Sequence, residues 1–358
     1  MNQIRLSKVL TEMKASGVEQ LLISDPTTIF YLMERWIHPG ERMLVLIIKS
    51  NGEHVLVINR LFPMPKLTNP KLVYFDDTQD GVTVLLTEID PSKTIGIDKT
   101  WPAHFLLNLM KQGQTTDFVL SSDITDHVRA LKSQEEIQLM KDVSADNDQA
   151  MGELQALIPA KLTELTMTKK LAEIYAKLDN SGFSFDPIVA YGANGADPHH
   201  MNDESVVKAG DSIILDIGGT KNGYCSDMTR TFFYQSVSDK SRDVYETVLE
   251  ANKRAIAAVK PGVPFSQIDA AARDYITEKG YGEFFTHRTG HFIGIECHEA
   301  GDVSAANHQL VEPGMIFSIE PGIYLAGEVG VRIEDLVVAT TTGCELLNHY
   351  PKELTIIP

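Results

Sequence analysis

The chain of 358 residues is poor in cysteine and in positive charge. Its cysteines, Cys225, Cys297 and Cys344, are too few and too scattered to form a disulfide framework. Lys and Arg total 32 against 49 Asp and Glu, which gives a net charge of −17, and the basic residues form no run. This charge opposes contact with a phosphate backbone, so we expect no nucleic-acid partner.

Long apolar segments are also lacking. The longest apolar run, residues 43–48, suits a buried strand and is far too short to span a bilayer. The amino-terminal segment MNQIRLSKVLTEMK has no apolar core of the length found in signal peptides. Together these features predict a soluble, cytoplasmic protein with no membrane partner.

The length predicts two domains, because single cores rarely grow beyond roughly 250–300 residues. Residues 1–127 read as alternating strands and helices, with a hairpin in MLVLIIKSNGEHVLVI whose strands are joined by Asn51-Gly52. This segment has the size of a compact α/β domain, and no catalytic cluster is visible in it. The boundary is expected near DITDHVRALKSQEE, where Ser133 and Glu136 have the spacing of a capping box that opens a helix.

Residues 128–358 repeat one order of elements, two helices followed by a hairpin. In the first repeat, Leu171, Ile174 and Tyr175 lie on one apolar face of a helix. In the second repeat, a helix is predicted to open at Ser266. The recurring order indicates an internal two-fold within a mixed α/β (α+β) fold.

Each predicted hairpin carries two carboxylates. In ILDIGGTKNGYCSDMTR, Asp216 and Asp227 face each other if the turn centres on Lys221-Asn222, with Cβ atoms about 4.5–5.5 Å apart. Glu320 and Glu334 flank a second turn in the same way. Carboxylates this close repel each other unless a proton or a cation lies between them. The segment DIGGTK by itself also resembles the phosphate-binding turn of sugar kinases, but such kinases normally carry it near the amino terminus.

A histidine completes a candidate metal centre. His291, in RTGHFIG, joins the two aspartates and two glutamates, whose four negative charges two divalent cations would offset. This charge balance suits a two-metal site, with ions ~3.5–4 Å apart around a shared water. The oxygen-rich ligand set favours manganese, with Co²⁺ or Zn²⁺ as alternatives.

The sequence contains four motifs in a fixed order: DIGGTKNGYCSDMTR, RTGHFIGIECHE, SIEPGIY and GVRIED. Together they closely resemble the motifs of the pita-bread metallopeptidases, most of all those of the Xaa-Pro dipeptidase (prolidase) and aminopeptidase P branch. The resemblance covers residues 128–358 and implies a pita-bread fold with pseudo-two-fold helix and hairpin repeats. Residues 1–127 resemble the smaller creatinase-type domain that precedes that fold.

The resemblance implies a role for each matching residue. The implied metal ligands are Asp216, Asp227, His291, Glu320 and Glu334. Asp227 and Glu334 would bridge the ions, and a bound water with a lowered pKa would be the nucleophile. Glu320 would act as general base toward this water and then as general acid toward the proline nitrogen.

Three further residues are implied to contact the substrate. His298 would hold the scissile carbonyl in an oxyanion-hole role. His199, rather than its neighbour His200, would be the substrate-side histidine. Arg332 would bind the substrate carboxylate or brace the site, because a guanidinium can bond a carboxylate with two N–H groups. The alternative for Arg332 is a purely structural pair with Asp335.

One departure from the family pattern concerns Phe292. Relatives usually have glycine directly after the metal-binding histidine, so Phe292 either narrows the substrate pocket or turns into the core. Cys225 and Cys297, which flank the ligand motifs, are interpreted as small buried fillers rather than ligands.

The predicted function is metal-dependent hydrolysis of Xaa-Pro dipeptides, which have proline at the second position. The alternatives are an aminopeptidase P acting on longer peptides, a creatinase-like hydrolase without metal and a non-catalytic binding module on the same fold. The last two would be expected to have lost carboxylate ligands, and none is missing. The resemblance also implies a homodimer, in which Arg35, His38 and Arg42 of the loop RWIHPGERM would reach over the partner's site and limit substrate length.

Overall fold

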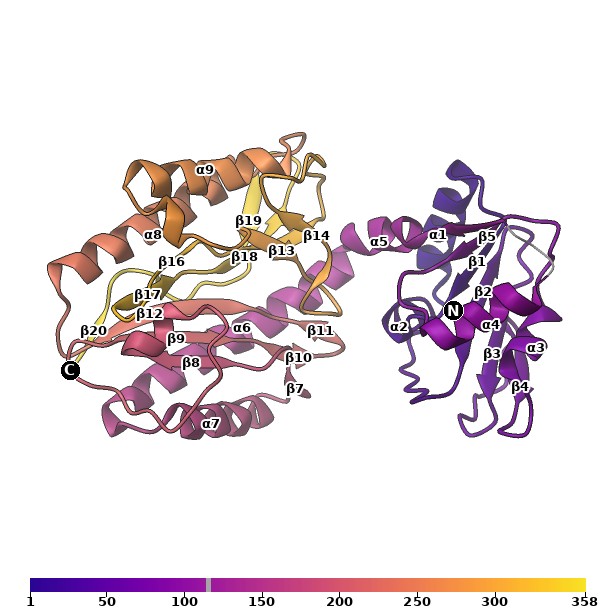
Figure 1. Cartoon of the computed structure of the whole chain (residues 1–358), viewed down its shortest axis with the longest axis horizontal. Helices are drawn as coiled ribbons and strands as arrows, with labels where there is room; N and C mark the ends of the chain where they lie inside the picture. The colour runs from indigo at the N-terminus through magenta and orange to yellow at the C-terminus, as the bar shows by residue number, and fades with distance from the viewer. Residues whose placement is uncertain (114–116) are drawn as a thin grey trace. The chain divides into compact units, whose positions relative to one another are not determined.

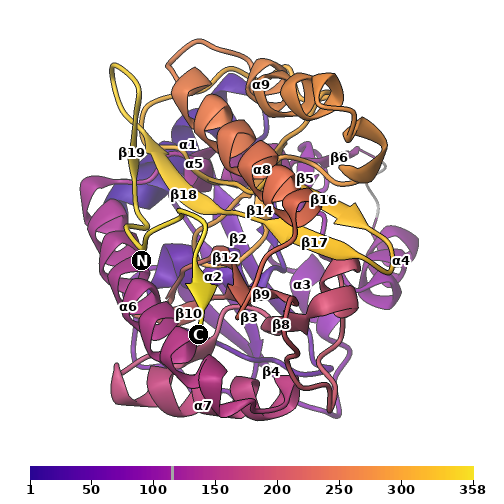
Figure 2. The same cartoon turned by 90° about the vertical axis from the view of Figure 1, so that its left-hand side faces the viewer.

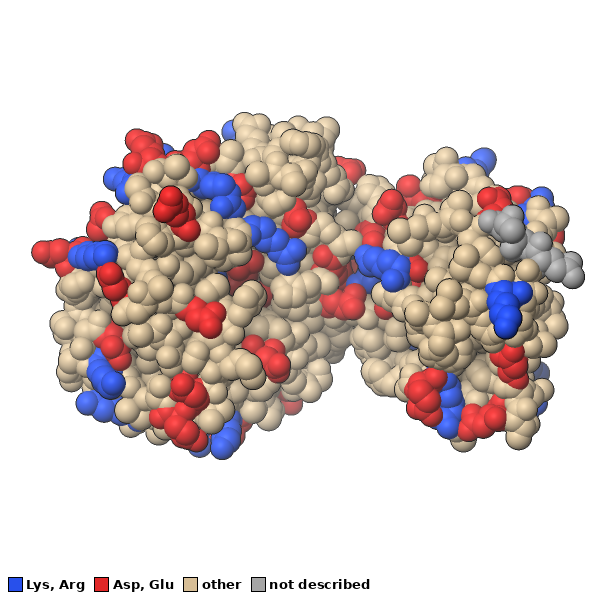
Figure 3. All heavy atoms as spheres, viewed as in Figure 1, with Lys and Arg blue, Asp and Glu red and all other residues tan. Residues whose placement is uncertain are grey.

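The computed structural model describes residues 1–113 and 117–358, and this part of the chain divides into two compact units, Met1–Arg129 and Ala130–Pro358. Both units mix helices and strands, as the sequence predicts for an α/β (α+β) fold (Figure 1). Among the described helices, none combines the length and the apolar character needed to cross a membrane. On the surface drawn in Figure 3, Lys and Arg side chains are interspersed with Asp and Glu.

The first unit is built on a mixed sheet with the strand order β4-β3-β2-β1-β5-β6. Its strands are β1 (Gln20–Ile23), β2 (Leu44–Lys49), β3 (Val55–Asn59), β4 (Lys71–Phe75), β5 (Ile95–Ile97) and β6 (Phe118–Leu120). Its helices are α1 (Gln3–Ala15), α2 (Pro26–Met33), α3 (Gly81–Leu86), α4 (Ala103–Gln112) and α5 (Ser122–Ala130). Strands β2 and β3 pair antiparallel, which confirms the predicted hairpin. Val45 and Val57 of this hairpin share a core with Leu85 of α3 and Leu109 of α4.

The second unit contains two pairs of helices. They are α6 (Gln134–Leu157), α7 (Glu164–Lys177), α8 (Asp239–Ala258) and α9 (Phe265–Glu278), with short 3₁₀ segments at Ile158–Ala160, Gly192–Ala196 and Gly282–Phe284. The predicted capping box is present at the start of α6. Helix α9 begins at Phe265, and the N–H groups of Phe265 and Ser266 donate to the carbonyl oxygens of Gln309 and Asn307. The predicted start at Ser266 is therefore wrong by one residue, because backbone carbonyls replace a side-chain cap there.

The strands of the second unit form two larger and two smaller sheets in the described part of the chain. The larger sheets have the orders β20-β12-β9-β8 and β14-β13-β15-β18-β19, and the smaller ones β11-β10-β7 and β16-β17. The strands before α8 are β7 (Gly182–Phe183), β8 (Ile188–Tyr191), β9 (Ser212–Ile217), β10 (Gly219–Lys221), β11 (Tyr224–Cys225) and β12 (Met228–Tyr234). Those after α9 are β13 (Gly290–Phe292), β14 (Glu299–Val303), β15 (Ile316–Ile319), β16 (Gly322–Leu325), β17 (Val329–Arg332), β18 (Asp335–Ala339), β19 (Cys344–Leu346) and β20 (Ile356–Ile357).

The order of two helices followed by a hairpin occurs twice in this unit, as predicted. Helices α6 and α7 share a core with β8, β9 and β12, whereas α8 and α9 share a second core with β15 to β18. Figures 1 and 2 show the first pair along one side of the strands and the second pair along the other. The strands therefore form a middle layer between two apolar cores.

Candidate metal centre and active site

A pocket of about 550 Å³ lies in the second unit and is lined by residues from both hairpins. The site residues predicted from the sequence all line it: Asp216, Asp227, His291, Glu320, Glu334, His199, His298 and Arg332. They come from β9, β13 and β17 and from the connections that precede β9, β12, β14, β16 and β18. The structure thus brings together residues that are up to 135 positions apart in the sequence (from 199 to 334).

The first hairpin turns one residue later than predicted. Strand β10 pairs with β11 so that the turn residues are Asn222 and Gly223, both with positive φ (52° and 81°). Asn-Gly favours such a turn, because both residues tolerate the left-handed conformation that it requires. As a consequence Asp216 lies opposite Thr229, and the predicted direct pairing of Asp216 with Asp227 is wrong.

The second hairpin does place its carboxylates opposite each other. Ile319 pairs with Asp335 on one side of the glutamates, and Gly322 pairs with Arg332 on the other. When either of these strand pairings is continued toward the glutamates, Glu320 falls opposite Glu334. The prediction for this hairpin therefore agrees with the strand register.

The two hairpins are joined by side-chain hydrogen bonds across the middle layer. Thr229 Oγ1 donates to Glu334 Oε2 (2.9 Å), and Thr231 Oγ1 donates to the carbonyl oxygen of Arg332 (2.8 Å). Arg230 Nη1 donates to the carbonyl oxygen of Glu334 (2.6 Å). Because these bonds link β12 to the segment 332–334, each hairpin fixes the position of the carboxylates on the other.

The carboxylates of the pocket are buried without enough hydrogen-bond donors. Asp216, Asp227 and Glu334 are 8%, 4% and 1% exposed. One oxygen of each (Oδ1, Oδ1 and Oε1) accepts no hydrogen bond from the described residues. Burial, reinforced by the neighbouring negative charges, raises the pKa of Asp216 and of Glu334. Such groups need protons or cations to be stable in this position, so the residues present fit a divalent metal centre.

His291 lies next to two carboxylates of the pocket, those of Asp227 and Glu320. Its Nε2 is 3.5 Å from Asp227 Oδ2 and 3.6 Å from Glu320 Oε1. A register shift between His291 and Phe292 interrupts the pairing of β13 with β14. One ligand atom each from Asp227, His291 and Glu334 lies within 4.8 Å of the others. This group could therefore hold a metal ion.

Arg332 is buried beside the carboxylates. Its Nη2 donates to Asp216 Oδ2 (2.6 Å), and its Nη1 donates to the hydroxyl of Tyr324 (2.8 Å). Asp335 is paired with Arg230 instead (2.8 Å), so the alternative interpretation of Arg332 as the partner of Asp335 is wrong. Arg332 offsets part of the negative charge in the pocket.

The two neighbouring histidines, His199 and His200, have different surroundings. His199 is exposed and lines the pocket. His200 contacts Glu164 instead, with 2.6 Å between Nε2 and Oε2. Across the pocket, His298 packs edge-on against His291, with ring centroids 4.2 Å apart. The geometry thus agrees with the choice of His199 over His200.

Sequence reasoning missed Glu164, which is completely buried at the start of α7. Its Oε1 accepts hydrogen bonds from Tyr191 N and Asn194 Nδ2 (both 2.9 Å). Its Oε2 accepts one from Asp203 N (3.0 Å) and contacts His200. Glu164 therefore fixes both ends of the segment 191–203, which carries His199. An acidic residue in the first turn of a helix is common for other reasons, so the sequence carried no signal of this role.

His287 was also missed, although it is only four residues before His291. It lines the pocket, and its Nε2 lies 2.8 Å from the hydroxyl of Tyr324. Burial lowers the pKa of His287. Since Tyr324 also accepts from Arg332, these residues form a hydrogen-bonded wall of the pocket.

Phe292 points away from the pocket. Its ring packs against those of Phe265 and Phe317, with centroids 5.1 and 5.8 Å apart, and the residue is 1% exposed. Gly301 provides the space, since a Cβ atom there would lie 2.6 Å from the Phe292 ring. The idea that Phe292 narrows the substrate pocket is therefore wrong, and the alternative, a place in the core, is confirmed.

The fold and the pocket together define the class of this protein as a metallopeptidase. Residues 138–341 match metallopeptidase family M24, and residues 5–131 match the creatinase/prolidase N-terminal domain. The chain belongs to metallopeptidase family M24 and carries the creatinase-type domain before its catalytic domain. The resemblance inferred from the four motifs is thereby confirmed.

Individual relatives agree with this assignment over nearly the whole chain. An uncharacterized peptidase of Staphylococcus aureus (strain MRSA252) is 32% identical over 355 residues, which are 97% of this chain and 99% of that protein. The crystal structure of dipeptidase PepE from Mycobacterium ulcerans matches with a TM-score of 0.92 and 31% identity, covering 99% of this chain and 98% of that one. A prolidase from Thermococcus sibiricus matches with a TM-score of 0.90 and 31% identity, covering 100% and 99%.

Proposed function

We propose that this chain hydrolyses Xaa-Pro dipeptides with two divalent cations held between its two hairpins. The observation that carries the proposal is the convergence of buried carboxylate oxygens of Asp216, Asp227 and Glu334, which lack hydrogen-bond donors among the described residues, on one pocket. Buried acceptors of this kind are stable only when a proton or a cation satisfies them. The likeness to a dipeptidase and to a prolidase supports the substrate class.

The proposed ligands are Asp216, Asp227, His291, Glu320 and Glu334, with Asp227 and Glu334 shared between the two ions. Divalent cations bound there would lower the pKa of an attacking water and polarise the scissile carbonyl. We propose manganese, because four of the five ligands are carboxylates, and Co²⁺ and Zn²⁺ are the ions to compare with it.

Glu320 is the carboxylate best placed to move a proton. Its side chain is 16% exposed, against 12% for Asp216 and 5% for Asp227, so it is the most open of the three to the pocket. Ser318 Oγ donates to its Oε1 (3.3 Å) and orients the group. We assign to Glu320 the removal of a proton from the attacking water and its delivery to the proline nitrogen.

The histidines are assigned to the substrate. His298, which is exposed in the pocket and packs against His291, would donate a hydrogen bond to the carbonyl oxygen as it gains negative charge. His199 would contact the substrate from the segment that Glu164 holds in place. The prolyl amide has no N–H, so recognition depends on shape and on the groups at its two ends.

Two roles were implied for Arg332, binding the substrate carboxylate and bracing the site, and its contacts favour the second. Its guanidinium is buried and already bonded to Asp216 and Tyr324, so we assign it to bracing the site. Arg288 lines the same pocket and is exposed. We therefore propose that Arg288 binds the substrate carboxylate.

The proposal includes a homodimer in the cytoplasm, both inferred from the sequence. Of the loop residues expected to reach a partner's site, Arg42 donates to Asp77 within its own unit (2.8 and 2.9 Å). Arg35 and His38 are exposed, and His38 stacks on Trp36 with ring centroids 5.6 Å apart. Arg35 and His38 are thus the residues of this loop to which we assign the limit on substrate length.

The test is hydrolysis of Leu-Pro and Leu-Pro-Gly-Gly by manganese-loaded protein, followed by mass spectrometry, with a chelator-treated control. Cleavage of Leu-Pro alone, abolished by chelator and by Glu320→Gln, is the expected result. Glu328→Gln is the matched control, because Glu328 is an exposed glutamate in the same hairpin region that pairs only with Lys240 among the described residues. Cleavage of the longer peptide would move the assignment to an aminopeptidase P, and activity that persists without metal would refute the proposal.

A further inference from the structure

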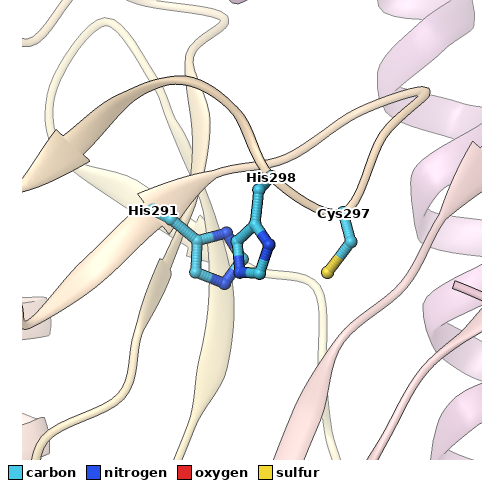
Figure 4. Close-up of side chains that lie close together, drawn as sticks. All are labelled: His291, Cys297 and His298. Carbon is cyan, nitrogen blue, oxygen red and sulfur yellow. The ribbon is translucent and has the colours of Figure 1, made fainter. Parts of the chain in front are cut away.

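A second set of metal-ligating side chains lies in the same pocket. One ligand atom each from His291, Cys297 and His298 lies within 4.8 Å of the others. Figure 4 shows the Cys297 sulfur pointing toward the two imidazoles, which come from β13 and from the segment before β14. The carboxylate set described above contains no sulfur, so this set differs from it in chemistry and shares only His291 with it.

The position of Cys297 is not that of a core filler. Its sulfur lies 3.3 Å from Asp227 Oδ2, and the residue lines the pocket although it is only 8% exposed. Asp227 is itself 4% exposed, and its Oδ1 accepts no hydrogen bond from the described residues. Cys225 provides a contrast, because its sulfur donates to the carbonyl oxygen of Ile295. The sequence-based interpretation of both cysteines as fillers therefore suits Cys225 better than Cys297.

The distances suit a cation with short bonds to nitrogen and sulfur. Zinc binds imidazole nitrogen at about 2.0–2.1 Å and thiolate sulfur at about 2.3 Å, so neighbouring ligand atoms of a tetrahedral site are about 3.4–3.6 Å apart. The ligand atoms of this cluster lie within 4.8 Å of one another, so they need to approach by little more than 1 Å to bind one ion. The His298 side chain can make this movement because it is exposed. A thiolate with two imidazoles selects softer cations, whereas Mn²⁺ prefers carboxylates.

We propose that His291, Cys297 and His298 form a site for a thiophilic divalent cation, such as Zn²⁺ or Cd²⁺, that overlaps the carboxylate site through His291. As the sulfur–metal bond forms, the thiol proton leaves to solvent. Occupation of this site removes His298 from the substrate and competes for His291. A thiophilic cation therefore inhibits the manganese-loaded enzyme, a consequence that rests on the proposed function.

The binding site is tested with Cd²⁺ added to metal-free protein. A cadmium–thiolate bond adds an ultraviolet charge-transfer absorption, and calorimetry on the same samples measures binding independently. We expect the absorption in the wild-type protein and in Cys225→Ser, which is the matched control, and its loss in Cys297→Ser. His298→Ala should weaken Cd²⁺ binding by more than about tenfold, since even second-shell changes cost 10–100-fold in metal affinity. Circular dichroism establishes that each variant is folded.

The outcomes separate this site from the proposed function. The proposed site is refuted if the absorption persists in Cys297→Ser. It is also refuted if the wild-type protein binds Cd²⁺ without this absorption, or does not bind Cd²⁺ at all. Hydrolysis of Leu-Pro by manganese-loaded protein, measured without Cd²⁺, tests the function alone. If both hold, Cys297→Ser should raise the Cd²⁺ concentration needed for half-inhibition by more than about tenfold relative to Cys225→Ser.

Discussion

Replacing Glu164 by glutamine is expected to loosen one wall of the pocket. The variant keeps an acceptor for Tyr191 N and Asn194 Nδ2 but places an NH₂ group against the N–H of Asp203. Turning the amide over moves the clash to the N–H of Tyr191. A hydrogen bond to a charged group contributes about 1.5–3 kcal/mol, and a buried donor left unpaired costs about 1–3 kcal/mol. We therefore expect Glu164→Gln to lower the free energy of unfolding by about 2.5–6 kcal/mol, the sum of these two ranges.

The assay is denaturant unfolding combined with steady-state kinetics on Leu-Pro. Glu173→Gln is the matched control, because Glu173 lies on the exposed side of the same helix and pairs with Lys170 at the surface. It should change stability little, since exposed pairs contribute little. KM for Leu-Pro should rise in Glu164→Gln, because Glu164 fixes the ends of the segment that carries His199. Equal stability and equal KM for the two variants would refute the positioning role of Glu164.

Three further predictions concern separate parts of the molecule. Phe292→Ala should cost about 3–5 kcal/mol of stability, because it leaves a cavity in the core. The ratio of the KM values for Leu-Pro and Ala-Pro should stay unchanged, and a changed ratio would show that the ring contacts the substrate. Arg288→Ala should raise KM for Leu-Pro by about tenfold or more through loss of a charge-assisted hydrogen bond, and should leave KM for the amide Leu-Pro-NH₂ unchanged; an equal effect on both would exclude carboxylate binding. Burial lowers the pKa of His54, so the unfolded chain binds more protons than the folded one below about pH 6.5, and stability is lost there as the pH is lowered. His54→Gln should flatten that part of the pH–stability curve, which chemical unfolding at several pH values would reveal.

The element order was predictable because each element has a local signal. The capping box before α6, the apolar face of α7 and the alternation of β2 and β3 all depend on residues close together in the sequence. The metal motifs were recognisable for the same reason. The turn at Asn222-Gly223 also had a local signal, the preference of Asn-Gly for positive φ, which outweighs the alternative centre one residue earlier.

The supporting contacts were not predictable, because they join residues that are distant in the sequence. Glu164 bonds to residues 27 to 39 positions away, and nothing in the first turn of α7 indicates them. The direction of Phe292 depends on the space left by Gly301 on the neighbouring strand. Asp335 pairs with Arg230, which is 105 positions earlier in the sequence, rather than with its near neighbour Arg332.

The hydrogen bonds between β12 and the segment 332–334 have a consequence for how the catalytic unit could be divided. A cut between β12 and α8, in residues 235–238, would leave Asp216 and Asp227 on one fragment and the remaining proposed ligands on the other. Neither fragment alone could assemble the centre, whereas the bonds from Thr229, Arg230 and Thr231 provide a ready interface between them. Manganese affinity in a mixture of the two halves would then report their reassociation, so this fold is a natural candidate for a split-protein sensor.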